Sequence, residues 1–218
     1  MKLNRTQVWT RVRVERAALV RDLEGIEVSA WETPSLCPGW DVHDVTAHLI
    51  DSATTTRLGF IRRMVASRFD FDRDNATGIA RERRTDPRQT LDALRATVDL
   101  RLTPPAPLAT RLVEAVVHGE DIRRPLGISH GYEPAALRGV LGYLVRTASG
   151  FGGGRERAAG LRLVADFAGS TDAWAYGSGP LVAGSAIDIL LALSGRPVAS
   201  GAILGPGAEA LRSRQTSG

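Results

Sequence analysis

Apolar residues recur every three or four positions through most of the first 145 residues, a spacing typical of amphipathic helices. The first predicted helix covers residues 5 to 26 and places Val8, Val12, Leu19 and Leu23 on one stripe. Further helices are predicted from Asp41 to about residue 64, from Pro87 to the proline cluster at 104 to 107, over residues 111 to 122, and from Pro134 onward. Helices in this number predict a bundle.

The pattern changes after the glycine-rich stretch at residues 150 to 154. Residues 161 to 165 alternate like a strand, and residues 173 to 176 and 180 to 183 follow as short strand candidates. Ser185 is a predicted N-cap for a helix over residues 186 to 193, and a last helix is expected after Gly207. We therefore expect a mainly α protein with a helical bundle in residues 1–150 and a small α/β domain in residues 155–218.

Two segments interrupt the helices. Residues 29 to 39 contain two prolines and lead into Leu36-Cys37-Pro38-Gly39-Trp40, which predicts a loop before the second helix. Trp31 and Trp40 in this region are either packing residues or part of a pocket wall. Residues 67 to 87 are polar and highly charged, so we expect a surface loop or lid there.

Composition excludes several classes of protein. Apolar residues make up 43% of the chain and charged residues 24%, which excludes disorder as the main state. No apolar run reaches the length of a membrane span and no secretory signal opens the chain, so we expect a cytoplasmic protein without a membrane partner. The net charge is +4, but the arginines are interspersed with acids and form no basic stripe, so no nucleic-acid partner is expected. Cys37 is the only cysteine, which excludes an internal disulfide; the thiol is either a nucleophile or a small buried group.

The predicted helix over residues 111 to 122 contains a candidate pair of metal ligands. Glu114 and His118 are four residues apart, so their side chains lie on one helix face. The alternative is a simple hydrogen-bonded pair on a partly exposed face. Among the other histidines, His48 is the favoured third ligand because it lies on or beside the inward face of its helix; His43 lies on another face, and His130 reads as a solvated loop residue.

Three stretches resemble the mycothiol-dependent maleylpyruvate isomerase family. Residues 35 to 49, from Ser-Leu-Cys-Pro-Gly-Trp-Asp to His48-Leu49, are similar to the N-terminal motif of this family. Residues 114 to 125 are similar to its second motif, and residues 186 to 196 are similar to its C-terminal domain. The resemblance implies a DinB-like four-helix bundle, followed by a small α/β domain, that binds a divalent metal, usually zinc, through His48, Glu114 and His118. It also implies mycothiol, the low-molecular-weight thiol of actinobacteria, as cofactor.

The implied chemistry is an isomerase or transferase reaction in which a metal-activated thiolate adds to a small electrophilic substrate. For an anionic substrate, Arg196 is the candidate carboxylate clamp, with Arg123 and Arg124 as alternatives; Arg196 could instead bond the last carbonyls of its helix. Asp121 and Asp44 are each positioned to orient a metal-binding histidine.

Two further functions use the same scaffold. One is a non-catalytic metal-binding or regulatory module. The other is hydrolysis by zinc-bound water, for which Glu120 or Asp121 would be the general base.

Overall fold

The computed structural model describes residues 3–215, which fall into two compact units. Asn4–His130 forms the first unit, and Leu3 with the residues from Gly131 onward forms the second. The division precedes α7 (Pro134–Leu144), which packs against α9 (Ala186–Leu193) within the second unit. The bundle unit is thus shorter than the 1–150 expected from the glycine-rich stretch, because α7 buries its apolar stripe against the second core.

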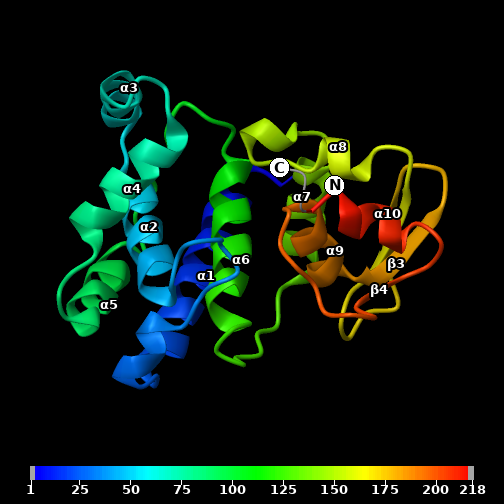
Figure 1. Cartoon of the computed structure of the whole chain (residues 1–218), viewed down its shortest axis with the longest axis horizontal. Helices are drawn as coiled ribbons and strands as arrows, with labels where there is room; N and C mark the ends of the chain where they lie inside the picture. The colour runs from blue at the N-terminus through cyan, green and yellow to red at the C-terminus, as the bar shows by residue number, and fades with distance from the viewer. Residues whose placement is uncertain (1–2, 216–218) are drawn as a thin grey trace. The chain divides into compact units, whose positions relative to one another are not determined.

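Four helices of the first unit form a closed bundle (Figure 1). They are α1 (Arg5–Glu24), α2 (Val42–Thr54), α5 (Pro87–Ala96) and α6 (Ala109–Arg123). Contacts run from α1 to α6, from α6 to α2, from α2 to α5 and from α5 back to α1. Leu23, Val45 and Ile122 are among the residues that fill the resulting core, so the predicted mainly α bundle is confirmed.

Local sequence signals define the starts of the first two helices. Asn4 and Gln7 form a capping box at α1, and Asp41 and Asp44 form one at α2, as expected for Asp41. A short 3₁₀ helix, η1 (Val28–Glu32), lies in the loop between α1 and α2. A backbone bridge between Pro34 and Asp41 closes the rest of that loop.

The single helix expected from Asp41 to about residue 64 is in fact two. Helix α2 ends at Thr54 and α3 (Arg57–Ala66) begins two residues later. The hydroxyl of Thr54 donates to the carbonyl of Ile50, that of Thr55 donates to the carbonyl of Asp51, and Thr56 accepts from the N–H of Gly59 as N-cap of α3. The prediction was wrong because these hydroxyls compete with the helix for its backbone groups.

The loop expected over residues 67 to 87 contains the helix α4 (Phe71–Glu82), capped by Asp70, which packs against α2. Its inner face is polar: Asp74 is buried and accepts hydrogen bonds from Arg63 at 2.9 and 2.8 Å. Gly78 lies so close to α2 that a Cβ there would be 2.6 Å from the carboxylate of Asp51. An apolar-periodicity criterion cannot detect a helix that packs through a glycine and ion pairs.

The second unit contains a four-stranded sheet in the order β2-β1-β3-β4. Strand β1 (Arg162–Asp166) pairs antiparallel with β2 (Ala173–Tyr176) and parallel with β3 (Leu181–Ser185), and β4 (Ile203–Leu204) pairs antiparallel with β3. The strongly buried α9 contacts both α7 and the sheet. The remaining helices are η2 (Ser149–Phe151), α8 (Arg155–Ala158) and α10 (Ala208–Ser213). The small α/β domain predicted from the sequence is confirmed. Over residues 3–215, no helix combines the length and apolar character needed to cross a bilayer.

Candidate metal centre

His48 on α2 and His118 on α6 face each other inside the bundle. Their ring centroids are 4.9 Å apart and the ring planes meet at 75°, an edge-to-face arrangement. Buried apolar neighbours, such as Val45 on α2 and Ala115 on α6, anchor the two helices in the core. Trp40 packs against His48 with ring centroids 5.1 Å apart, so this tryptophan is part of the site wall. The structure thus brings together two of the three predicted ligands.

Asp121 orients the ring of His118. Its Oδ2 atom lies 2.8 Å from His118 Nδ1, and the aspartate is fully buried. A hydrogen bond from Nδ1–H to the carboxylate leaves the lone pair on Nε2, as in the carboxylate–histidine pairs of metal sites. Asp44, the other candidate for this role, instead accepts hydrogen bonds from the backbone N–H of Asp41, in the capping box of α2, and from Arg83 Nη1 at 2.6 Å.

His48 is held in its neutral form. Burial is the main cause that lowers its pKa to about 3, and the nearby His118 and Arg111 add to the shift. Its Nδ1 atom is buried, and it has no hydrogen-bond partner within residues 3–215. A neutral imidazole with an available nitrogen is the form that binds a metal ion.

Glu114 is held by two other side chains. Arg111 Nη2 donates to its Oε1 at 2.6 Å and Ser52 Oγ donates to its Oε2 at 2.7 Å. Arg111, which is almost completely buried, also donates to Ser52 Oγ at 2.7 Å. In this structure the carboxylate therefore interacts with a guanidinium group and a hydroxyl, and its oxygens do not join the histidine nitrogens in one close cluster of donor atoms.

Cys37 reaches the site from the loop that precedes α2. Its Sγ lies 3.0 Å from Asp121 Oδ2 and 3.8 Å from His118 Nδ1. Within residues 3–215, Cys37, His118 and Asp121 are the group of potential metal ligands whose donor atoms all lie within 4.8 Å of one another. The backbone N–H of Leu36 donates to the carbonyl of Asp121 at 3.2 Å, which ties the loop to α6. Sequence reasoning anticipated a small buried thiol but not its place beside His118.

The other two histidines have structural partners. His43 is buried, with Nε2 2.7 Å from the hydroxyl of Thr90 and its ring against the edge of Trp31. His130 was expected to be a solvated loop residue, and that prediction was wrong. Its Nε2 lies 2.8 Å from Oε2 of Glu15, a carboxylate that is only 4% exposed. The buried acid on α1 requires a partner, which the sequence alone does not reveal.

The candidate arginines are also engaged within their own units. Arg123 is fully buried and donates to Asp22 at 2.7 Å, and Arg124 donates to Glu120 at 2.8 Å. Glu120, a candidate general base, is therefore part of an ion pair. In the second unit, Arg196 Nη1 donates to the carbonyl of Ser194, the C-cap of α9, at 3.1 Å. This is the helix-end contact given above as the alternative to a substrate clamp.

The donors present suit a divalent ion such as Zn²⁺. Two imidazoles converge, one of them next to a buried carboxylate that fixes its tautomer, and a glutamate lies one turn before His118 on the same helix. Nitrogen and carboxylate oxygen are preferred Zn²⁺ ligands, and three protein ligands leave the open position typical of a catalytic site. To bind the metal, the carboxylate of Glu114 would have to contact both the ion and Arg111, or give up its bond to Arg111.

The fold is a helical bundle followed by a small α/β unit, and comparison with known proteins finds a family whose model matches part of the bundle. Residues 12–106 match the family model described as the mycothiol maleylpyruvate isomerase N-terminal domain. This segment is therefore similar to that family, and it contains the first motif on which the resemblance rests.

Two solved structures share the fold over nearly the whole chain. They are a mycothiol-dependent maleylpyruvate isomerase (TM-score 0.63, 18% identity) and a histidine-to-alanine mutant of such an enzyme (TM-score 0.64, 17% identity). Each match covers 94% of this chain and 93% of the other. The comparison with curated proteins gave no match.

Proposed function

We propose that this protein is a metal- and thiol-dependent isomerase or transferase. The observation that supports it most is the edge-to-face pair of His48 and His118, with Asp121 behind His118, in a bundle of the mycothiol maleylpyruvate isomerase type. The proposed thiol is mycothiol and the proposed substrate is a small electrophile, for which maleylpyruvate is the first compound to test.

In this proposal His48, Glu114 and His118 hold the metal. A divalent ion bound there would lower the pKa of a coordinated thiol and so supply a thiolate at neutral pH. Asp121 fixes the tautomer of His118, while Ser52 and Arg111 limit the rotation of Glu114. Arg196 is the proposed clamp for a substrate carboxylate, a role that requires its guanidinium group to remain accessible beside its contact with Ser194.

A second ligand set deserves a direct test because its atoms are already close together. Cys37, His118 and Asp121 would offer one sulfur, one nitrogen and one oxygen. The thiolate of Cys37 would then occupy a coordination position that the favoured set leaves open for an external thiol. Substitution of Cys37 separates the two sets, since only the second loses a ligand.

Elemental analysis of the purified full-length protein tests the proposal. We expect about one divalent ion per chain, lost in His48→Ala, Glu114→Ala and His118→Ala but retained in Cys37→Ser. His130→Gln is the matched histidine control, because glutamine can still donate to Glu15. Loss in Cys37→Ser with retention in His48→Ala would favour the second ligand set.

An activity assay then separates the enzyme from a binding module. The metal-loaded protein is mixed with mycothiol and maleylpyruvate, and product formation is followed with and without thiol. Turnover that requires both metal and thiol supports the proposal. Bound metal without any thiol-dependent turnover of this or related electrophiles would favour the non-catalytic alternative. Turnover of an ester or amide without thiol would favour zinc-bound water as the nucleophile.

A further inference from the structure

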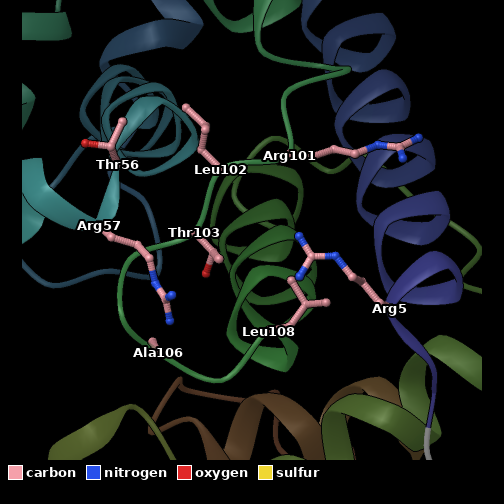
Figure 2. A pocket seen from close by; sticks show the side chains of 8 residues that line it. All are labelled: Arg5, Thr56, Arg57, Arg101, Leu102, Thr103, Ala106 and Leu108. Carbon is pink, nitrogen blue, oxygen red and sulfur yellow. The ribbon is translucent and has the colours of Figure 1, made fainter.

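A cavity of about 430 Å³ lies in the first unit, and neither His48 nor His118 lines it (Figure 2). Its walls come from the start of α1, the junction of α2 and α3, and the segment between α5 and α6. Three of its lining residues are arginines: Arg5, Arg57 and Arg101. The part of the chain that the structure describes contributes no acidic residue to the lining.

Two of these arginines are directed into the cavity. Figure 2 shows the guanidinium groups of Arg5 and Arg57 extending inward from opposite walls, with the hydroxyl of Thr103 between them. Arg101 extends away from the centre of the cavity, toward α1. Leu108 lies below Arg5, and Leu102 lies at the opposite end of the cavity.

The arginines of the cavity are exposed and differ from the arginines of the same unit that form ion pairs. Arg63, Arg83 and Arg111 each form ion pairs with acidic side chains at 2.6 to 2.8 Å. Over residues 3–215, by contrast, none of the guanidinium groups of Arg5, Arg57 and Arg101 forms a hydrogen bond or an ion pair with the protein. Like charges that face a common space repel each other, and an anion between them relieves that repulsion.

We propose that this cavity binds a small organic dianion. The planar guanidinium groups of Arg5 and Arg57 suit carboxylate or phosphate oxygens, because each can donate two parallel hydrogen bonds. Thr103 offers a hydroxyl to the same anion, and Leu102 and Leu108 contact a short apolar body. The volume lies at the lower end of the range for small-molecule pockets, which fits a dicarboxylate or a phosphate monoester rather than a nucleotide.

The cavity lies beyond the end of α2 and before the start of α6, the two helices that carry the candidate metal centre. Thr56 follows Ser52 by four residues, and Leu108 precedes Arg111 by three. Ser52 and Arg111 are the residues that hold Glu114, so the anion site begins next to the helix ends that position this carboxylate. The two sites share no residue, and anion binding here does not depend on the proposed metal chemistry.

Isothermal titration calorimetry on the full-length protein tests the proposal. Succinate represents the dicarboxylates and inorganic phosphate the phosphate esters, with acetate as the monoanion control, all at low ionic strength where screening is weak. We expect at least one dianion to bind more tightly than acetate. The double variant Arg5→Gln/Arg57→Gln is expected to weaken that binding by about tenfold or more.

The matched control is Arg62→Gln/Arg88→Gln, which removes two arginines of α3 and α5 that are exposed like Arg5 and Arg57 but do not line the cavity. Equal weakening in this control would overturn the proposal, because it would reduce the effect to net charge. Failure of both succinate and phosphate to bind would also overturn it. Binding of only phosphate or only succinate supports the site and assigns the class of ligand.

Two further measurements keep the test independent of folding and of the metal. The arginine Nε–H signals of the wild-type protein in NMR spectra should shift for Arg5 and Arg57 on addition of the dianion, and unchanged signals would contradict the site. Binding should persist in His118→Ala, which removes a proposed metal ligand. Failure of the metal proposal thus leaves this result unaffected.

Discussion

His118 Nδ1 and Asp121 Oδ2 lie 2.8 Å apart, and the aspartate is completely buried. This contact fixes which nitrogen of His118 remains free, and it also places Oδ2 3.0 Å from the thiol of Cys37. One carboxylate therefore supports both an imidazole and a thiol at the candidate metal centre.

Replacement of Asp121 should weaken metal binding without abolishing it. In Asp121→Asn the amide keeps the shape but loses the charge that makes His118 a stronger ligand, so metal affinity should fall about 10- to 100-fold. Competition with a chromophoric chelator measures the change. Unchanged affinity would show that His118 is not a ligand, whereas complete loss of metal, together with loss in Cys37→Ser, would assign Asp121 to the coordination shell.

His43 should make folding stability depend on pH. Burial, and then the nearby Arg83, lower the pKa of the folded state below the ordinary value of about 6.5. As pH falls below about 6.5 the unfolded chain takes up a proton at this site while the folded chain does not, so stability is lost on acidification. The slope from this one group is at most about 1.4 kcal/mol per pH unit.

The contribution of His43 is isolated by comparison with His43→Gln. Urea unfolding between pH 7.5 and 5 in the presence of chelator should give a shallower pH dependence for the variant, because other buried groups titrate equally in both proteins. Parallel curves would contradict the assignment. The amide of glutamine can still bond to Thr90, which limits the loss of stability at neutral pH.

The sequence predicted those helices whose apolar stripes face the core. In α1 and α6 the expected bounds lie within two residues of the observed ones, and α7 begins at Pro134 as expected. Helix α4 was missed because a glycine and ion pairs hold it to α2 and α3. Such contacts become visible only when residues distant in sequence, here Asp51 and Asp74, are known to be neighbours.

The candidate site was predictable in part for the same reason. Helical spacing and the family motifs singled out His48 and His118, which the structure places ring against ring. The position of Cys37 depends on how the loop before α2 folds back onto α6, and no periodicity encodes that path. The hold of Arg111 on Glu114 was likewise not anticipated, although the two are only three residues apart on one helix.

Gly78 should be required for the contact between α4 and α2. Intrinsic helix propensity alone would make Gly78→Ala stabilising by about 1 kcal/mol. The added methyl group, however, would lie 2.6 Å from the carboxylate of Asp51, which is buried and bonded to Arg63. Overpacking of this kind costs about 1–3 kcal/mol, and disruption of the ion pair adds to it, so we expect net destabilisation. Thermal unfolding measures the sign, and a higher melting temperature would contradict the close packing of α4 on α2.

Glu15 and His130 should be strongly coupled. The carboxylate of Glu15 is 4% exposed, and its Oε2 lies 2.8 Å from His130 Nε2, so His130→Ala leaves a buried carboxylate without this partner. Removal of one member of a buried pair typically costs about 3–5 kcal/mol, and the partial exposure of His130 places our expectation near the lower end of that range. Glu15→Gln should cost less stability because the amide is neutral.

A double-mutant cycle from urea unfolding near pH 6 separates the interaction of Glu15 and His130 from the effects of their surroundings. The double variant should be more stable than the sum of the single effects predicts. Additive effects would show that the two residues do not interact in solution, and that Glu15 is stabilised by other groups on α1 or by water.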